Sequence, residues 1–296
     1  MQNLSIIIVS YRCWDKLAIC LDSISKQSLA NLEVIVVDNH SNDGKAAAFM
    51  TNFPHIKFML QNMNGGFAQA CNKGASVAKG DGFLFLNPDT ILLPNTLGPL
   101  LEQVNAHPDW KLTAIKQLDE KGRDTYPFGL FMRWWNIWPP IRSIERFFKR
   151  NQYGKKQLSA AAVSYPEWLS GSFILIRKQD FETIGGWDES FWMYSEDMDL
   201  SKRAYDLGWK RVLYNELSCV HSHGGSSRAN PKVKAITKTA VIKSAYHYMQ
   251  KHLRFPGKWI AIGTHILVIG IELIVMFPFS STKRNILLQL IKPIKP

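Results

Sequence analysis

Two acidic segments far apart in the chain carry the side chains best suited to chemistry. The first is Asn87-Pro88-Asp89, which directly follows the apolar run of residues 83–86. Such a run predicts a buried strand, and ligands of open α/β sheets collect beyond the carboxyl ends of strands. Asp89 is therefore a candidate ligand for a hard cation on a phosphate-bearing molecule. The same three residues are also ordinary turn chemistry after a strand, so a structural role stays open.

The second acidic segment is Ser195-Glu196-Asp197-Met198-Asp199, which follows the aromatic-rich residues 191–194. Ser195 is a candidate N-cap of a helix that runs to about Leu207, and acidic residues in a first turn favour the helix dipole. That structural account explains Glu196 and Asp199 but not the aromatic residues just before them. Apolar surroundings raise the pKa of a carboxyl group, which suits a general base.

A histidine pair forms a third candidate site, because His221 and His223 stand beside Gly224-Gly225 and close to Arg228. Neutral imidazole nitrogen binds metal ions, and a nearby cation held by a carboxylate favours the neutral form. The cluster predicts a metal or phosphate contact, although an isolated histidine is usually structural.

Polar residues also follow two strands predicted near the N-terminus, residues 4–9 and 32–37. After the first, Ser10 precedes Tyr11, which could stack on a base; after the second, Asp38 or Asn39 could hydrogen-bond a base edge. A core position for Tyr11 and a capping role for Asp38 are the alternatives.

The elements that would position these residues alternate along the chain. A helix at about residues 14–27, a strand at 56–60, a glycine-opened helix at 64–74 and a strand at 173–177 add to those above. Strands alternating with helices predict an α/β fold whose sheet is parallel and binds a nucleotide. The pair Gly65-Gly66 is weak support for nucleotide binding on its own, because neither the Walker A pattern nor G-x-G-x-x-G occurs.

Charge is distributed unevenly along the 296 residues. The formal net charge is +12, of which residues 1–110 contribute −2 and the remainder +14. The second half therefore favours an acidic partner such as lipid headgroups, diphosphates or nucleic acid. The four cysteines show no zinc spacing, and we expect reduced, mostly buried thiols in a cytoplasmic protein without a secretory signal.

Two segments suit a membrane surface. Residues 131–150 interleave Trp and Phe with Arg and Lys, which predicts a basic amphipathic helix, although an ordinary surface helix is the alternative. Residues 259–279 are almost wholly apolar, yet Glu272 within a bilayer would cost on the order of 2.5–3.5 kcal/mol. Monotopic attachment is favoured over a span. Basic flanks would face lipid phosphates; they are Lys251, Arg254, Lys258, Lys283 and Arg284.

Taken in order, these segments resemble the GT-A glycosyltransferases of family 2, and most closely the rhamnosyltransferase-like branch that builds bacterial surface polysaccharides such as O-antigen. The resemblance runs from about residue 4 to residue 228. Its motifs are VVDNHSNDG at 36–44, NGGFAQACNKG at 64–74, LNPD at 86–89, GSF at 171–173, FWMYSEDMDL at 191–200 and HSHGGS at 221–226.

The resemblance implies an inverting, metal-dependent transfer of a sugar from a nucleoside diphosphate. Asn87-Pro88-Asp89 takes the place of the family's D-x-D element, so Asp89 would carry most of the binding of Mg²⁺ or Mn²⁺. His221 matches a histidine that completes the coordination or touches the diphosphate, and His223 is its rival. Asp197 matches the catalytic base, with Glu196 as the second candidate. Further residues would bind the sugar nucleotide: Ser10, Tyr11, Asp38, Asn39, Asn64, Gly66, Phe67, Asn72, Asn87 and Arg228.

The implied organisation is a GT-A domain over residues 1–228, with a basic aromatic insertion at 131–155, and a helical membrane-associating region over 229–296. We expect L-rhamnose transfer from dTDP-rhamnose to a saccharide on a polyprenyl diphosphate, peripheral or monotopic at the cytoplasmic face of the bacterial inner membrane. A UDP-hexose donor is the alternative. A basic nucleic-acid-binding protein is the rival outside the enzymes, but its recognised motifs are missing from the sequence.

Overall fold

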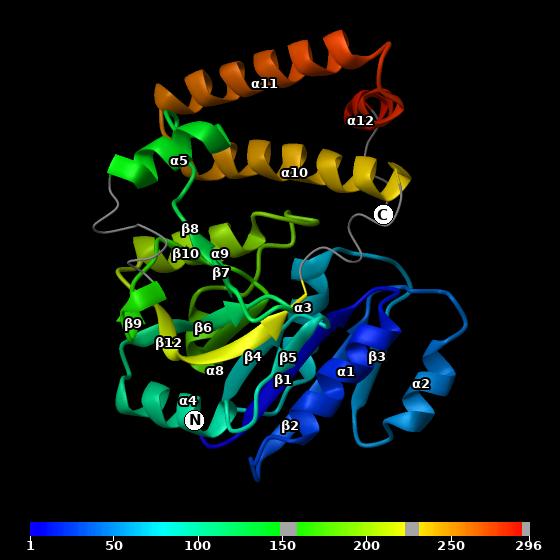
Figure 1. Cartoon of the computed structure of the whole chain (residues 1–296), viewed down its shortest axis with the longest axis vertical. Helices are drawn as coiled ribbons and strands as arrows, with labels where there is room; N and C mark the ends of the chain where they lie inside the picture. The colour runs from blue at the N-terminus through cyan, green and yellow to red at the C-terminus, as the bar shows by residue number, and fades with distance from the viewer. Residues whose placement is uncertain (149–158, 223–230, 292–296) are drawn as a thin grey trace.

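The computed structural model describes residues 1–148, 159–222 and 231–291. A ten-stranded sheet forms its centre, and three C-terminal helices lie as a layer above it (Figure 1). Four N-terminal strands lie side by side in the order β3-β2-β1-β4 and are parallel, as predicted. They are β1 (Leu4–Ser10), β2 (Leu32–Asp38), β3 (Lys57–Leu60) and β4 (Gly82–Leu86), and the helices among them are α1 (Trp14–Ser25), α2 (Ala46–Asn52) and α3 (Phe67–Val77).

The strand tips meet at one edge of this parallel part. Ser10 pairs with Asp38 across β1 and β2, while Ile8 of β1 pairs with Leu86 of β4. The polar residues that follow β1, β2 and β4 therefore leave the sheet on the same side.

Beyond β4 the sheet becomes mixed. The order continues β11-β6-β12-β5; β11 is antiparallel to β4 and β6, whereas β12 is parallel to β6. These strands are β5 (Thr90–Leu92), β6 (Trp110–Leu118), β11 (Phe173–Arg177) and β12 (Lys210–His221), with β7 (Asp124–Thr125) and β9 (Val163–Ser164) paired at the side. A second, two-stranded sheet joins β8 (Phe128–Gly129) to β10 (Trp168–Leu169), and the helices are α4 (Leu97–Ala106), α8 (Lys178–Thr183) and α9 (Glu196–Asp206).

Each face of the sheet buries its own core. Ile7 of β1 packs with Cys71 of α3 on one face, while Ile6 and Ile8 pack with Leu17 of α1 on the other. Alternate residues of a strand point to opposite faces, so helices on both sides explain why β1 is buried throughout.

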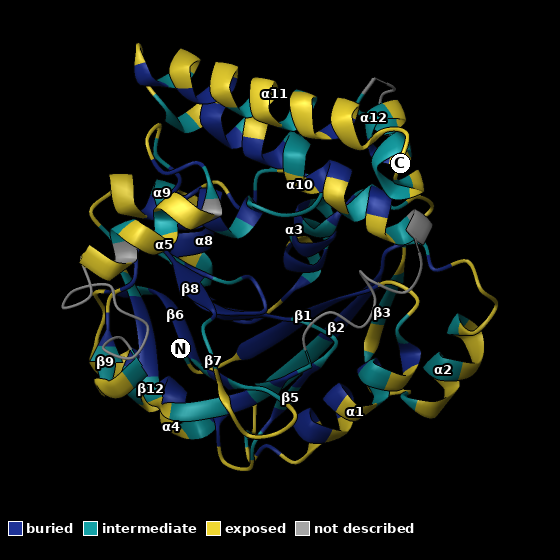
Figure 2. Cartoon of the chain, turned by 45° about the horizontal axis from the view of Figure 1, so that its top comes forward, coloured by how far each residue is buried: buried dark blue, intermediate teal, exposed yellow. Residues whose placement is uncertain are grey.

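The C-terminal layer consists of α10 (Pro231–His252), α11 (Gly257–Met276) and α12 (Ser281–Ile291), with α5 (Pro139–Phe148) beside it (Figure 1). Helix α10 shares a buried core with the sheet-containing part of the chain through Tyr248, Met249 and Phe191. Helix α11 is apolar and long enough to cross a membrane by length and composition, and 17% of its most apolar window is buried. Its outer side is exposed (Figure 2), and Glu272 contacts Lys283 of α12.

Candidate active site

The carboxylate of Asp89 and the imidazole of His221 face each other just past the ends of β4 and β12. Nε2 of His221 lies 3.1 Å from Oδ1 of Asp89. On the other side, Nζ of Lys16 in the first turn of α1 lies 3.6 Å from Oδ2 of Asp89. Three segments distant in sequence thus converge on one carboxylate.

The other nitrogen of His221 fixes the orientation of its ring. Nδ1 lies 3.0 Å from Oε1 of Gln117, and Nε2 of Gln117 donates a hydrogen bond to Oγ of Ser172 at 2.7 Å. Because an amide oxygen only accepts, Nδ1 of His221 donates to Gln117, and Nε2 is the nitrogen that faces Asp89. This is how a histidine is held to ligate a metal.

The donor chemistry at this point fits a divalent cation. Nε2 of His221 and an oxygen of Asp89 face each other at hydrogen-bond distance, which requires a proton or a cation between them. Carboxylate oxygen and imidazole nitrogen are both metal ligands. Among the described residues no third His, Cys, Asp or Glu joins them, so further ligands would come from other groups or from a bound diphosphate.

Asp197 lies in the first turn of α9, where two backbone groups hold its carboxylate. Oδ2 accepts a hydrogen bond from the N–H of Gly171 at 3.2 Å, and Oδ1 accepts one from the N–H of Met198 at 2.8 Å. The side chain is partly exposed. Asp197 is therefore aimed rather than free to rotate, which a positioned proton acceptor requires.

A continuous path connects the two acids. Ser172, which receives the hydrogen bond from Gln117, directly follows Gly171, which donates to Asp197. The path runs through Asp89, His221, Gln117, Ser172, Gly171 and Asp197. The structure therefore brings the two acidic segments of the sequence into one region.

The two ends of this path have opposite protonation tendencies. Burial opposes the charge of Asp89, but the hydrogen bond and charge of His221 and the charge of Lys16 outweigh it and lower the pKa of Asp89. Burial raises the pKa of Asp197 despite its two backbone hydrogen bonds. Burial and the charge of Asp197 raise the pKa of Glu196 well above its usual value. Asp89 is thus an anion that can hold a cation, and the Glu196–Asp197 pair takes up a proton readily.

The backbone just before α9 is bent into a left-handed conformation, with φ of 70° at Tyr194 and 64° at Ser195. Such residues cost about 1–3 kcal/mol each and persist where the surrounding structure holds them. Ser195 is the N-cap residue of α9, as predicted, but its left-handed backbone replaces the usual extended one and its side chain makes no capping hydrogen bond. Its carbonyl oxygen instead accepts the N–H of Asp199 at 2.8 Å.

The glycine loop before α3 is held between the end of β2 and the loop before α9. Nδ2 of Asn39 donates to Oδ1 of Asn64 at 3.0 Å and to the carbonyl oxygen of Gly66 at 3.1 Å. Gly66 has φ of 89°, and a Cβ there would lie 2.1 Å from the carbonyl oxygen of Trp192. The N–H of Phe67 donates to that same oxygen at 3.1 Å. These predicted ligand residues therefore hold the glycine loop against the loop before α9, and their contact with a ligand stays a prediction.

The predicted nucleoside residues lie at the tips of β1 and β2. Ser10 is buried, while Tyr11 is 41% exposed, so Tyr11 does not occupy a core position. The guanidinium of Arg12 lies 5.3 Å from the centre of the Tyr11 ring. Asp38 is buried and accepts hydrogen bonds from the hydroxyl and the N–H of Ser41. Tyr11 thus presents an exposed aromatic ring beside the ends of β1 and β2.

The remaining predicted ligands differ in their surroundings. The amide of Asn72 exchanges hydrogen bonds with the backbone of Trp187 at 2.9 and 3.0 Å, which gives it a role in holding that loop. Nδ2 of Asn87 lies 3.5 Å from Nε2 of His221. His223 and Arg228 lie outside the described residues.

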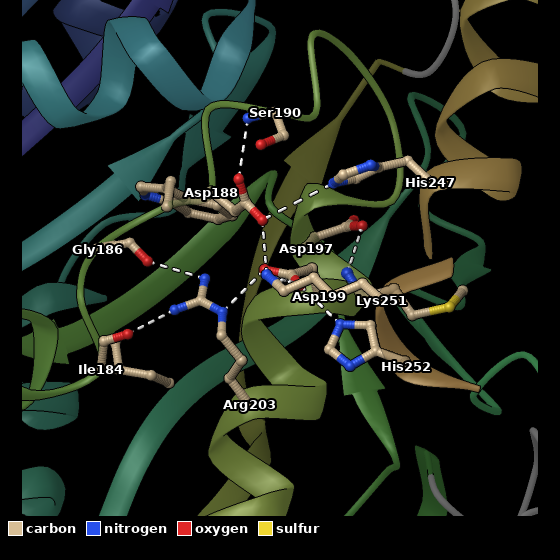
Figure 3. A network of polar contacts seen from close by, with 12 residues as sticks. Ile184, Gly186, Asp188, Ser190, Asp197, Asp199, Arg203, His247, Lys251 and His252 are labelled. Atoms are coloured by element: carbon tan, nitrogen blue, oxygen red, sulfur yellow. Dashed lines mark hydrogen bonds and ion pairs between the residues drawn. The ribbon is translucent and has the colours of Figure 1, made fainter. Parts of the chain in front are cut away.

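A network of charged side chains joins α9 to α10 (Figure 3). The buried carboxylate of Asp199 contacts Nε of Arg203 at 2.8 Å, Nζ of Lys251 at 2.7 Å and Nε2 of His252 at 2.7 Å. Lys251 also lies 2.6 Å from Asp188. Burial opposes the charge of both carboxylates, but these partners outweigh it; they lower the pKa of Asp199 and lower that of Asp188 to about 2.

This network corrects two expectations. Lys251 does not face lipid phosphates, because its ammonium group is paired with Asp188 and Asp199. The role of Asp199 is not limited to a favourable interaction with the helix dipole. Its ion pairs with Lys251 and His252 also hold α10 beside the turn that carries Asp197. Sequence reasoning also missed Lys16 and Gln117; a polar glutamine inside the largely apolar strand β6 was the one available signal for Gln117.

The sequence of this chain is similar to those of known proteins. The model of the family described as Glycosyl transferase family 2 matches residues 5–198, which is more than half of the chain. Over 291 residues the chain is 26% identical to N-acetylglucosaminyl-diphospho-decaprenol L-rhamnosyltransferase of Mycobacterium tuberculosis, covering 90% of this chain and 92% of the relative. It is also 26% identical over 241 residues to the uncharacterized glycosyltransferase YwdF of Bacillus subtilis, covering 75% of this chain and 85% of that one.

Two solved structures show the same fold. A crystal structure of GalNAc-T7 with UDP, GalNAc and Mn²⁺ superposes with a TM-score of 0.58 at 18% identity, covering 85% of this chain and 52% of that one, so the chain spans about half of GalNAc-T7. Residues 1–349 of S. aureus TarS, solved with UDP, superpose with a TM-score of 0.54 at 17% identity, covering 95% of this chain and 73% of that one. The predicted GT-A type of α/β fold is therefore confirmed.

Proposed function

The chain belongs to glycosyl transferase family 2, and we propose that it is an inverting, metal-dependent hexosyltransferase that moves a sugar from a nucleoside diphosphate to a saccharide carried on a polyprenyl diphosphate. The observation that carries the proposal is the hydrogen-bonded path from Asp89 to Asp197. The path supports the proposal because it joins the carboxylate that we assign to cation binding with the carboxylate that we assign to proton acceptance.

Asp89 and His221 would hold the Mg²⁺ or Mn²⁺ ion at the donor diphosphate. The bound cation supplies Lewis-acid stabilisation of the negative charge that develops on the diphosphate leaving group. Lys16, whose ammonium group lies 3.6 Å from Asp89, adds a positive charge at the same end. Tyr11 and Asn39, at the tips of β1 and β2, stand where the nucleoside would lie at the sheet edge.

Asp197 acts as the general base for the acceptor hydroxyl. Its raised pKa makes its carboxylate a better proton acceptor than an ordinary aspartate. Inversion requires that the base and the leaving group lie on opposite faces of the sugar. Carboxylates from two separate elements, one after β4 and one on α9, suit that requirement without a covalent intermediate.

The favoured donor is dTDP-L-rhamnose. Its support is the relative from Mycobacterium tuberculosis, which is named a rhamnosyltransferase acting on N-acetylglucosaminyl-diphospho-decaprenol and aligns over 90% of this chain. A UDP-hexose is the second candidate, because both solved neighbours contain UDP.

The C-terminal layer suits attachment to the membrane surface that holds such an acceptor, at the cytoplasmic face of the bacterial inner membrane. Exposed apolar residues gather on α11 and α5, among them Trp259, Leu267, Ile274 and Phe148. Helix α11 lies alongside α10 rather than projecting from the protein (Figure 1), which favours a monotopic arrangement over a span. Alkaline or high-salt extraction should release much of the protein, whereas retention in the membrane pellet would contradict monotopic attachment.

The proposal is tested with a panel of sugar nucleotides, a polyprenyl-diphosphate-linked saccharide and Mg²⁺ or Mn²⁺. We expect release of the nucleoside diphosphate with one donor, strongest for dTDP-rhamnose, and loss of release in the presence of a chelator. No release from any donor of the panel would overturn the proposed function. Release from a UDP-hexose alone would correct the donor.

A further inference from the structure

A cavity of about 280 Å³ lies between α10, α11 and α12, on the opposite side of α10 from the catalytic loop. Its body is apolar. The apolar positions come from all three helices and are Ile242, Ile269, Leu273, Leu287 and Leu290, with Gly270 among them. We call this cavity the α10–α12 groove.

One end of the groove is polar. Lys243 and Tyr246 of α10 and His265 of α11 also line it. A short connection joins the end of α10 to the start of α11, and Tyr246 and His265 lie toward it. The leucines of the groove lie at the other end, with Leu273 late in α11 and both Leu287 and Leu290 in α12. The groove therefore has an apolar body and a hydrogen-bonding end.

His265 is the group in the groove that the protein leaves unsatisfied. Both of its ring nitrogens are buried, and neither has a hydrogen-bond partner among the described residues. Its ring stacks on Trp138, with ring centres 5.4 Å apart, which fixes it in place. A buried polar group without a partner is costly, so a bound molecule with a polar head would stabilise this arrangement.

The groove also reaches the exposed apolar side of α11. Ile266 lines the groove and is nevertheless 58% exposed. An apolar chain could therefore enter from the surface that we assign to the membrane. On the far side of α10, Oγ of Ser244 donates to the carbonyl oxygen of Met193 at 2.8 Å, three residues before Glu196. One helix thus separates the groove from the catalytic turn.

We propose that the α10–α12 groove binds a stretch of the isoprenoid chain of the polyprenyl acceptor, with the polar end of the groove toward the diphosphate. The inference rests on the proposed function, because that function supplies the acceptor's chemistry. An isoprenoid chain matches the apolar body, and an anionic head matches the charge of Lys243 and the unsatisfied ring N–H of His265.

The test fills the groove without disturbing the protein. Gly270 lines the groove, and a Cβ added there meets nothing within 4 Å. Gly270→Leu is therefore tolerated, and leucine is the better helix former. Gly263→Leu is the matched control, because Gly263 lies on the same helix, is exposed, does not line the groove and also has no neighbour within 4 Å of an added Cβ.

Binding is measured with the full chain in detergent micelles, using a long-chain polyprenyl diphosphate and its geranyl analogue as probes. We expect Gly270→Leu to weaken binding of the long chain about tenfold, the equivalent of about two methylene contacts. Binding to phosphatidylglycerol vesicles should match the wild type, and the geranyl analogue, which offers only two isoprene units to the groove, should lose less affinity than the long chain. Gly263→Leu should leave all three unchanged.

Equal long-chain binding by the wild type and Gly270→Leu would overturn the proposal, and so would an equal loss in Gly263→Leu. Loss of vesicle binding in step with the long-chain probe would assign the groove to bilayer lipid instead. These binding results do not depend on turnover. If they hold while no sugar nucleotide is consumed, the proposed function fails and the groove assignment stands.

Discussion

Lys251→Met tests whether α10 is structurally part of the catalytic unit. The substitution keeps most of the aliphatic chain and removes the ammonium group that lies 2.7 Å from Asp199 and 2.6 Å from Asp188. Asp199 has no exposed surface, so water cannot replace the lost partner. It retains Arg203 and His252, which limits the damage.

The magnitude follows from these contacts. A hydrogen bond between charged groups contributes about 1.5–3 kcal/mol, and the 30% exposure of the Lys251 side chain reduces this through solvent screening. We expect a loss of about 2 kcal/mol in the free energy of unfolding at neutral pH, equivalent to about 3 °C in Tm for a chain of 296 residues. Asp188 has a lowered pKa of about 2, so its share of the stability is present above its usual pKa of 3.8. That share is lost as the pH falls from 3.8 toward 2, and the difference between the proteins should shrink there.

The assay is thermal unfolding of wild type, Lys251→Met and the matched control Lys26→Met across this pH range. Lys26 pairs with Asp22 on α1, where the side chains are 65% and 60% exposed, so the control should lose less than about 0.5 kcal/mol. Equal losses in the two variants at neutral pH would refute the reasoning, because the buried network would then be no stronger than a surface pair.

Three further predictions concern the site. Burial and the neighbouring carboxylate raise the pKa of Glu196 well above 4.5, so the folded chain keeps a proton that the unfolded chain releases, and stability falls as the pH rises above 4.5. In calorimetry, Glu196→Gln should therefore have a higher Tm than the wild type at about pH 8 but not at about pH 4. An equal gain in Tm at both pH values would contradict this prediction. Gly66→Ala should lower the free energy of unfolding in urea by about 1–3 kcal/mol more than Gly44→Ala does. Both glycines have positive φ, but only at Gly66 would the added Cβ clash with backbone atoms, so equal losses would disprove the clash. Gln117→Leu should lower the affinity for Mn²⁺ by about 10–100-fold in calorimetric titration, because Gln117 orients His221; unchanged affinity would exclude that role.

The parallel part of the fold was predictable because its signals are local. The first predicted strand began at Leu4 and was followed at once by Ser10, and β1 spans Leu4–Ser10. The predicted strand at residues 173–177 is β11, but its antiparallel pairing to β4 was not foreseen. Whether a strand is parallel or antiparallel to its neighbour depends on how the chain connects them, and the residues of β11 do not indicate that connection. The predicted burial of most cysteines is confirmed, since Cys20, Cys71 and Cys219 are buried.

The candidate site was only partly accessible from the sequence. The family resemblance predicts Asp89 and His221 in one metal site, and the structure places them 3.1 Å apart; their roles stay predictions. The network around Asp199 could not be found, since its partner His252 is 53 residues away. Ion pairs between remote elements depend on tertiary packing, and Lys251 carries the same basic charge whether it faces lipid or a buried carboxylate.

The central claim is that Asp197 accepts the proton of the acceptor while Asp89 holds the donor end of the site. The most direct measurement compares Asp197→Asn with the wild type in two assays, donor binding by titration and turnover by release of nucleoside diphosphate. We predict nearly unchanged donor affinity and a fall in turnover of about 10²–10⁴-fold. Wild-type turnover by Asp197→Asn would contradict the account.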